Sequence, residues 1–383
     1  MALHFSAGEF VDRQKRVIAE MIDRGVDGLL MFRQESMYYL TGYDSFGYVF
    51  FQCLYLGTDG RMMLLTRSPD LRQARHTSVI EDIRIWVDGR AADPARQLRE
   101  ILGELGCKGR HLGVEYDAYG LTAKNGKLLD SALSGFCMLT DASDLVNRLR
   151  VVKSPAELVY VRKAAELADR ALDEVHRLAR AGADEGDILA AMQGAIFAGG
   201  GDYPGNEFII GSGHDALLCR YKSGRRKLDA QDQLTLEWAG VYRHYHAVLM
   251  RTILIGRATR RHKEMHEVAV EAMQACTAAL KPNRPLGEVF DAYAKTCDAA
   301  GMNAHRLNAT GYSLGATYAP NWMDWPMLYH GNPAPAEPNM VLFLHMILMD
   351  SESGIAMCPG HTLVVTETGC EPLSAHSLDL VVK

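Results

Sequence analysis

Residues 232–252, DQLTLEWAGVYRHYHAVLMRT, alternate apolar and polar side chains at the two-residue period of a β-strand. The segment is also dense in titratable and aromatic groups, which are costly to bury unless they pair with one another or with a ligand. These groups are Glu237, Tyr242, Arg243, His244, Tyr245, His246 and Arg251. The segment therefore predicts a β-layer that carries either a functional site or a closed polar network.

The same alternation predicts which side chains share a face of the strand. An unbroken strand would put Tyr242, His244, His246 and Met250 on one face and Glu237, Tyr245 and Arg251 on the other. A turn near Gly240 would reset this assignment, because a turn restarts the alternation.

Length and composition limit the class of protein. At 383 residues the chain exceeds what one core usually supports, so we expect two domains. Its 48% hydrophobic and 23% charged residues are ordinary for a soluble globular protein. The net charge of −6 argues against a nucleic-acid partner, because phosphate binding needs a basic face. The one dense basic run, residues 220–227, is expected to be a solvated hairpin.

Cysteine spacing and hydropathy predict the compartment. The eight cysteines are scattered without a CxxC pair, which is typical of reduced thiols in the cytoplasm rather than of disulfides or a zinc site. The N-terminal residues lack the basic and apolar regions of a signal peptide. No apolar stretch reaches the roughly eighteen residues of a membrane span. We therefore expect a cytoplasmic protein without a membrane partner.

The first part of the chain alternates between helix and strand patterns, which predicts an α/β domain over residues 1–145. Helices are expected at 7–24, 71–76 and 94–105, strands at 28–32, 49–56, 62–65, 83–86 and 111–114, and a polar loop at 33–43. The turn GTDG at 57–60 joins the second and third of these strands.

A long amphipathic helix then opens the second predicted domain, residues 146–383. Ser154 is its expected N-cap, Pro155 its first helical residue, and Glu157 lies in the first turn. Further helices are expected at 185–198, 261–280 and 285–300, and strands at 341–348 and 362–366 beside the segment 232–252. This order predicts an α+β domain with helices on one face of a curved antiparallel sheet.

Four segments, in this order along the chain, resemble the active-site segments of the creatinase / aminopeptidase P family. They are residues 211–221 (GSGHDALLCRY), 236–252 (LEWAGVYRHYHAVLMRT), 311–315 (GYSLG) and 363–374 (LVVTETGCEPLS), and residues 150–172 resemble the interdomain helix. The resemblance implies a C-terminal pita-bread domain and a homodimer in which the N-terminal domain of one subunit reaches toward the other's site. The loop at 33–43 is then the expected reaching segment.

Metallopeptidases of this family hold two metal ions with two aspartates, one histidine and two glutamates. The resemblance places these five positions at Glu237, Val248, Tyr312, His345 and Gly360. Two hard cations need about five or six oxygen or imidazole ligands, and valine and glycine side chains supply none. We therefore expect no catalytic metal and no cofactor. A single zinc ion on Glu237, His244 and His246 would require these three side chains to share a face.

The chain resembles the metal-free branch more closely, whose members creatinase and ectoine hydrolase cleave C–N bonds in a guanidine or a cyclic amidine. The segments shared with ectoine hydrolase are 200–204 (GGDYP), 237–247 (E-x-AGVY-x-x-YHA) and 311–315 (G-Y-x-x-G). The chain departs from both hydrolases at three positions: their histidine falls on Arg220 or Cys219, the creatinase carboxylate on Met250, and their late glutamate on Gly360.

Five residues are the candidate catalytic groups. Glu237 is an expected acid/base or nucleophile, unless it only forms a salt bridge with Arg251 or Arg220. His244 and His246 fit a proton shuttle with an orienting partner, and His246 is preferred. Tyr312 is an expected donor to a developing negative charge, and His345 is either a second polarising group or a satisfied core histidine.

A second set of residues is expected to bind the substrate. Arg220 suits a substrate carboxylate, because guanidinium binds that group with two parallel hydrogen bonds. Trp322, Asp324 and Trp325 would form a box for a small cation, although aromatic loop residues are more often simply packed. The remaining expected substrate-binding residues are Tyr203, Tyr242 and Arg251.

The sequence thus predicts a metal-independent hydrolase of a non-peptide C–N bond in a small carboxylated nitrogen compound, such as an ectoine-like cyclic amidine or a guanidino acid. Three alternatives remain open at this level. The first is an Xaa-Pro aminopeptidase or prolidase-like enzyme with a degenerate metal site, the second is a catalytically inactive ligand- or partner-binding protein, and the third is a lyase.

Overall fold

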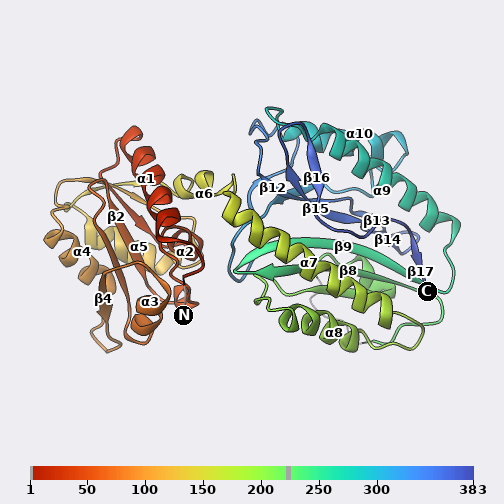
Figure 1. The fold of residues 1–383 in the computed structure, drawn as a ribbon, viewed down its shortest axis with the longest axis horizontal. Helices are drawn as coiled ribbons and strands as arrows, with labels where there is room; N and C mark the ends of the chain where they lie inside the picture. The colour runs from red at the N-terminus through yellow and green to blue at the C-terminus, as the bar shows by residue number, and fades with distance from the viewer. Residues whose placement is uncertain (1–2, 221–225) are drawn as a thin grey trace. The chain divides into compact units, whose positions relative to one another are not determined.

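The computed structural model describes residues 3–220 and 226–383, and the chain folds into two compact units, Met1–Arg150 and Val151–Lys383 (Figure 1). The division falls five residues beyond the expected boundary at 145. The short helix α6 (Leu145–Arg150) explains this shift, because Leu145 and Val146 are buried in the core of the first unit. Most of the basic run at 220–227 lies outside the described residues.

The first unit is an α/β domain built on a six-stranded sheet of order β4-β3-β2-β1-β5-β6. The β1–β2 and β2–β3 pairs are antiparallel, whereas the β1–β5, β5–β6 and β3–β4 pairs are parallel. Strand bounds are β1 Gly28–Met31, β2 Cys53–Gly57, β3 Met62–Arg67, β4 Asp82–Trp86, β5 His111–Val114 and β6 Met138–Asp141. The other helices are α1 Ala7–Asp23, α2 Gln34–Thr41, α3 Leu71–Thr77, α4 Pro94–Glu104 and α5 Ala123–Leu133.

Both faces of this sheet carry a hydrophobic core, as the alternation along β1 shows. Leu29 and Met31 pack into the core formed with α1, α2 and α6, whereas Leu30 and Phe32 pack into the core formed with α4 and α5. A four-residue strand that is buried on both faces is a continuous apolar run, as expected for a sheet covered by helices on each side.

The predicted polar loop at 33–43 is wrong, because this segment contains the buried helix α2. A helix that is buried nearly all round has no polar face, so its sequence lacks the amphipathic period. Glu115 makes the burial tolerable: its carboxylate accepts hydrogen bonds from the backbone N–H of Phe32 and Arg33 and from the Ser36 hydroxyl. The exposed apolar side chains of this region instead follow α2, in residues 46–50.

The second unit is an α+β domain with a nine-stranded sheet, whose main path runs β11-β10-β12-β15-β9-β8-β7. Its strands are β7 Ile209–Ser212, β8 Asp232–Tyr242, β9 Tyr245–Ile255, β10 Gly311–Ser313, β11 Asp324–Met327, β12 Val341–His345, β15 Gly360–Val365, β16 Cys370–Pro372 and β17 Val381–Val382. The small hairpin β13 Leu348–Asp350 and β14 Ile355–Met357 lies apart from this path. The predicted strand at 341–348 is therefore two short strands.

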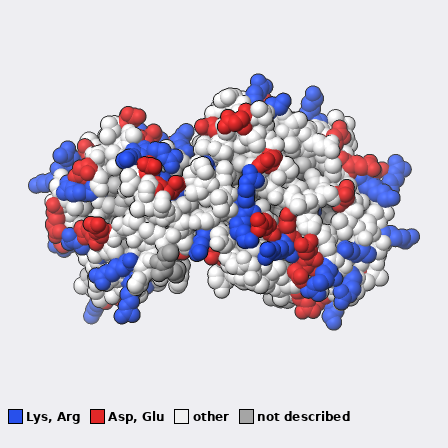
Figure 2. Space-filling model, viewed as in Figure 1, with Lys and Arg blue, Asp and Glu red and all other residues white. Residues whose placement is uncertain are grey.

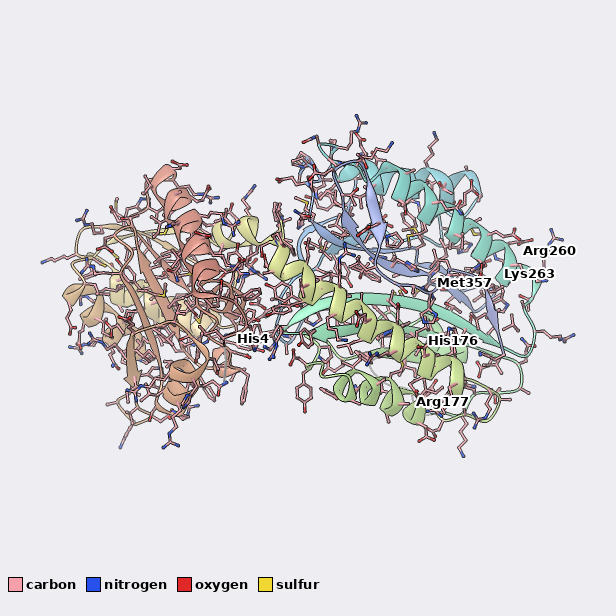
Figure 3. All side chains as sticks on the ribbon, in the orientation of Figure 1. His4, His176, Arg177, Arg260, Lys263 and Met357 are labelled. Carbon is pink, nitrogen blue, oxygen red and sulfur yellow. The ribbon has the colours of Figure 1, made fainter. Side chains whose placement is uncertain are left out.

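Four helices cover one face of this sheet: α7 Pro155–Leu178, α8 Glu185–Ala198, α9 Arg260–Ala279 and α10 Gly287–Ala299. Ser154 caps α7 in a reciprocal pair of hydrogen bonds with Glu157, and Pro155 is the first helical residue, as predicted. In Figure 3, where His176 is labelled on α7, this helix runs along β8 and β9, and Trp238 of β8 donates to the Ala168 carbonyl in α7. The opposite face of the sheet is therefore free to carry a site.

The strands β8 and β9 form one hairpin with a two-residue turn at Arg243 and His244, both with left-handed φ values of 52° and 65°. The turn lies beyond Gly240, so the assignment of faces expected from the sequence is wrong. Glu237 pairs with Met250 and Val241 with His246, and paired residues point to the same side. Glu237, Met250 and His246 thus share the concave face, while Tyr242, Tyr245 and Arg251 share the helix-covered face.

Three general features complete the description. All eight cysteines are free thiols. Lys and Arg are interspersed with Asp and Glu over the face shown in Figure 2. Within the part of the chain that the structure describes, no helix is both long and apolar enough to cross a membrane.

Candidate active site

One row of residues crosses five strands on the concave face. The register aligns Ile209, Glu237, Met250, Gly360 and His345 on β7, β8, β9, β15 and β12. Tyr312 on β10 lies in the neighbouring row, opposite Phe343. Four strand spacings separate β10 from β8, about 19 Å along a flat sheet. The Tyr312 hydroxyl nevertheless reaches the Glu237 carboxylate, so the sheet must curl around this face.

A chain of hydrogen bonds fixes the orientation of Glu237. The Trp322 indole N–H donates to the Tyr312 hydroxyl at 2.9 Å, and the Tyr312 hydroxyl lies 3.1 Å from Glu237 Oε1. An indole nitrogen only donates, so the single proton of Tyr312 is directed to Glu237. Oε1 therefore remains an acceptor, and a proton on the carboxyl group belongs on Oε2.

The electrostatics place the ionisation of Glu237 near neutral pH. Burial raises its pKa from 4.5 to about 7, although the Tyr312 hydrogen bond and the charge of Arg220 both favour the carboxylate. The side chain retains partial access to solvent, so a ligand can reach it. Burial and the neighbouring Glu237 charge raise the pKa of Tyr312 well above its usual value, so the phenol stays protonated. Glu237 thus suits proton transfer or attack at neutral pH.

His345, at the end of β12, is a neutral ring with an unused nitrogen. Its side chain is 8% exposed, and burial lowers its pKa to about 4. Among the described residues, Nδ1 has no hydrogen-bond partner. A buried polar atom without a partner typically costs about 1–3 kcal/mol, so it marks a position where a ligand atom would be favourable. The Tyr312 ring lies 5.9 Å away between centroids.

Cys219 and Arg220, which follow the short helical turn Gly213–Leu217 after β7, interact electrostatically with the same cluster. The positive charge of Arg220 favours the ionised forms of Glu237 and Tyr312, and Arg220 itself is exposed to solvent. The Cys219 thiol lies 3.6 Å from the sulfur of Met349. Burial, followed by the Glu237 charge, raises the pKa of Cys219. The charge of Arg220 therefore acts on the Glu237 cluster, and its role as the anchor of a substrate carboxylate stays a prediction.

His246, the preferred histidine in the sequence, shares the face of Glu237 but is committed to backbone contacts. Its Nε2 accepts from the Gly205 N–H at 2.8 Å, so Nδ1 carries the proton and donates to the His244 carbonyl at 2.8 Å. Burial lowers its pKa to about 4, which keeps the ring neutral. Four residues along the hairpin separate it from the level of Glu237, about 13 Å. The geometry gives His246 a structural part: it ties residues 201–208 to the hairpin.

Three other predicted residues lie away from the Glu237 cluster. His244 stacks on Tyr318 with ring centroids 4.3 Å apart. Tyr242 packs against Tyr160 on the helix-covered face. Arg251 lies on that face too, so the alternative of a salt bridge between Glu237 and Arg251 is wrong.

The predicted cation box is divided between two environments. Trp322 is 2% exposed and points to Tyr312, whereas Trp325 is 40% exposed. Asp324 accepts from the Trp325 N–H, and a Cβ on Gly315 would lie 3.4 Å from Asp324 Oδ2 and 3.6 Å from the Lys153 ammonium. The buried Lys153 ammonium group therefore already lies near Asp324, where the predicted box would place the cation of a substrate.

Tyr203 lies in a separate open groove. The groove has a volume of about 660 Å³ and is lined by Gln193, Phe197, Tyr203, Pro204, Gly205, Asn206, Glu207, Ala319 and Pro320. Tyr203 is 80% exposed and packs edge-on against Phe197. The structure thus places Tyr203 outside the row of Glu237 and His345.

The residues at the expected ligand positions do not fit a pair of metal ions. Val248 and Gly360 supply no hard donor, and a Cβ on Gly360 would lie 2.7 Å from the Phe343 ring and 2.9 Å from Met250 Cβ. The ring therefore fills the space that a carboxylate from this position would need. Within residues 3–220 and 226–383, no group of three or more His, Cys, Asp or Glu side chains is arranged to hold a metal ion.

Two residues of this site were missed by the sequence analysis. Phe343 and Met349 are apolar residues within apolar strands, where nothing distinguishes them from core residues. The one available signal was the alternation, which puts Phe343 on the same face as His345 two residues later.

A curled antiparallel sheet backed by helices on one face is the pita-bread fold, and in this chain a carboxylate, a tyrosine and a histidine meet on its concave face. The chain belongs to metallopeptidase family M24, which it matches over residues 159–367. Residues 13–152 match the creatinase/prolidase N-terminal domain. The predicted fold and the predicted family are confirmed.

The relatives include both peptidases and a non-peptide hydrolase. The chain is 29% identical to an uncharacterized hydrolase/peptidase of Sinorhizobium fredii over 100% of this chain and 99% of the relative. It is 26% identical to ectoine hydrolase of Halomonas elongata over 100% and 99%. A prolidase from Thermococcus sibiricus superposes with a TM-score of 0.89 over 99% and 100% of the chains at 18% identity, which shows a common fold.

Proposed function

We propose that the protein is a metal-independent hydrolase of a non-peptide C–N bond in a small carboxylated nitrogen compound, such as an ectoine-like cyclic amidine or a guanidino acid. One observation carries this proposal. The half-buried carboxyl group of Glu237, with a pKa of about 7, is held by Tyr312 in a row where Met250 and Gly360 leave no hard ligands.

The geometry supports a definite role for Glu237. Because Oε1 accepts from Tyr312, Oε2 is the atom that takes a proton from water or attacks the substrate carbon directly. Both routes need the carboxylate form. Tyr312 then orients Glu237 in the resting site, and His345 Nδ1 is the unused polar atom that can hydrogen-bond to a substrate nitrogen.

The charges also fit a zwitterionic substrate. An amidinium or guanidinium group beside Glu237 would favour its ionised form, so binding the substrate would itself lower the pKa of the base. A carboxylate on the same substrate would bind Arg220, whose exposed guanidinium acts on Glu237 through its charge. Arg220 thus selects carboxylated compounds among those with a suitable cationic end.

A peptidase remains the second candidate, because the likeness to a prolidase extends over the whole fold. Under that alternative the enzyme would act on Xaa-Pro peptides with metal ions bound in a depleted site. The described donors at the expected positions, Glu237 and His345, are too few for two ions.

The test begins with a thermal-shift screen over ectoine-like amidines, guanidino acids and short Xaa-Pro peptides, followed by product analysis of every compound that binds. We expect turnover of a carboxylated amidine or guanidino compound that persists in chelator, with no stoichiometric metal by elemental analysis. Cleavage of Xaa-Pro peptides that is lost in chelator and restored by Mn²⁺ would support the peptidase instead. A ligand that binds wild type and Glu237→Gln equally, and that neither converts, would indicate a binding protein.

A further inference from the structure

Glu237 and its partners come from opposite sides of one strand junction. Glu237 lies on β8, which pairs with β9, whereas Tyr312 and His345 lie on β10 and β12, which connect through β15. Among the strands of residues 3–220 and 226–383, the sheet order joins the two halves of the site only through the junction between β9 and β15. Its geometry sets the distance from Glu237 to Tyr312.

This junction has little backbone pairing. Its register contains one pair, Gly360 with Met250, whereas the β8–β9 ladder has eleven pairs and the β12–β15 ladder has five. A junction with so few ladder pairs needs other groups to hold it, because buried backbone donors and acceptors must be satisfied. Side chains supply these contacts.

Beside the Gly360–Met250 pair, the Thr362 side chain on β15 makes the hydrogen bonds to β9 that a backbone ladder would otherwise make. Its hydroxyl accepts from the Val248 N–H at 2.8 Å and donates to the Val248 carbonyl at 2.8 Å. A single buried side-chain oxygen thus satisfies both polar groups of one residue of β9. Four residues beyond Val248 on β9, the Thr252 hydroxyl accepts from the Cys358 N–H at 3.1 Å.

Arg251 holds the pair itself. Its Nη1 donates to the Met250 carbonyl at 2.8 Å and to the Gly360 carbonyl at 2.7 Å, one on each strand. Its Nη2 lies 2.6 Å from Nε2 of His361, and burial with the Arg251 charge lowers the pKa of His361 to about 3, so that ring is a neutral acceptor. The buried guanidinium group therefore links the two strands at the junction by hydrogen bonds.

We infer that Thr362 and Arg251 are positioning residues that hold Glu237 within hydrogen-bonding distance of Tyr312. The inference deepens the proposed function, on which its relevance to catalysis rests. Loosening the junction would lengthen the bond between the Tyr312 hydroxyl and Glu237. Because that bond favours the carboxylate, its loss raises the pKa of Glu237 further.

The test compares Thr362→Val, which keeps the volume and removes the hydroxyl, with Thr362→Ser, which keeps the hydroxyl. The titration of Glu237 is followed by carbon-13 NMR of glutamate labelled at its carboxyl carbon, with the signal assigned by its loss in Glu237→Gln. Hydrogen exchange reports the Val248 amide. Thr296→Val serves as the matched control, because that hydroxyl donates to the Ala292 carbonyl within α10, away from the junction.

In Thr362→Val we expect the Glu237 pKa to move upward by at least half a unit and Val248 exchange to speed up at least tenfold, with Thr362→Ser and Thr296→Val close to wild type. Should Thr362→Val fail to fold, Arg251→Lys, which can reach one of the two carbonyls, must shift the Glu237 pKa the same way. An unchanged titration in a folded variant overturns the inference. The readout needs no turnover, so it stands apart from failure of the proposed reaction.

Discussion

At the scale of the residue, Glu237 carries the proposed chemistry, and replacing it isolates the charge from the shape. Glu237→Gln keeps the acceptor for Tyr312 but has no carboxylate. Turnover of the identified substrate should fall by about 10²-fold or more, the usual scale for a lost acid/base group. Steady-state kinetics check this, with Glu166→Gln on the exposed side of α7 as control. Turnover within a few-fold of wild type would rule out the role given to Glu237.

The same residue makes stability depend on pH in a direction that the structure fixes. The folded pKa of Glu237 is about 7 and its ordinary value is 4.5, so the folded protein binds the proton more tightly than the unfolded chain. Stability is then lost as pH rises from 4.5 through 7, by about 3 kcal/mol in total. Glu237→Gln should therefore melt above wild type at pH 8 and near it at pH 4.5. Equal melting temperatures at pH 8 would contradict the raised pKa.

At the scale of the element, the β8–β9 hairpin depends on His246. Its ring accepts from the buried Gly205 N–H and donates to the His244 carbonyl, which also accepts from the Thr317 N–H, so His246→Leu removes the partner of the Gly205 N–H. We expect a loss of about 2 kcal/mol in the free energy of unfolding, measured with denaturant. His330→Leu, at an exposed position, is the matched control and should cost little. An altered pH profile of turnover without a loss of stability would instead give His246 a catalytic role.

The hairpin also shows how far the sequence could predict this protein. The start of α7 was predictable because Ser154, Pro155 and Glu157 form a local signal. The faces of the hairpin were not, because Arg243 and His244 make a left-handed turn without the glycine or asparagine that usually marks one. The bond between Tyr312 and Glu237 joins residues 75 positions apart, and only the curl of the sheet brings them together.

At the scale of the whole molecule, the expected homodimer stays a prediction, but the segment that would form it changes. Residues 33–43 contain the buried α2, whereas Phe46, Val49 and Phe50 expose apolar side chains just after it. Light scattering should give twice the mass of the chain. A stable dimer of this kind is expected to bury more than about 1,000 Å² of surface in total. Phe46→Asp should weaken the dimer, and Tyr119→Ser, at another exposed position of the same unit, should not. A monomeric wild type at micromolar concentration would remove this idea.

The Phe343 ring over Gly360 has a consequence for the evolution of the protein. A glutamate at Gly360 would collide with that ring, so Gly360→Glu alone should destabilise the fold by about 1–3 kcal/mol through overpacking. In the background of Phe343→Ala the same substitution should cost markedly less, which a double-mutant cycle of unfolding free energies measures. Additive costs would show that the ring is no obstacle. If the costs are coupled, a lineage that has acquired Phe343 cannot regain the acidic residue by single tolerated mutations unless the aromatic residue is lost first.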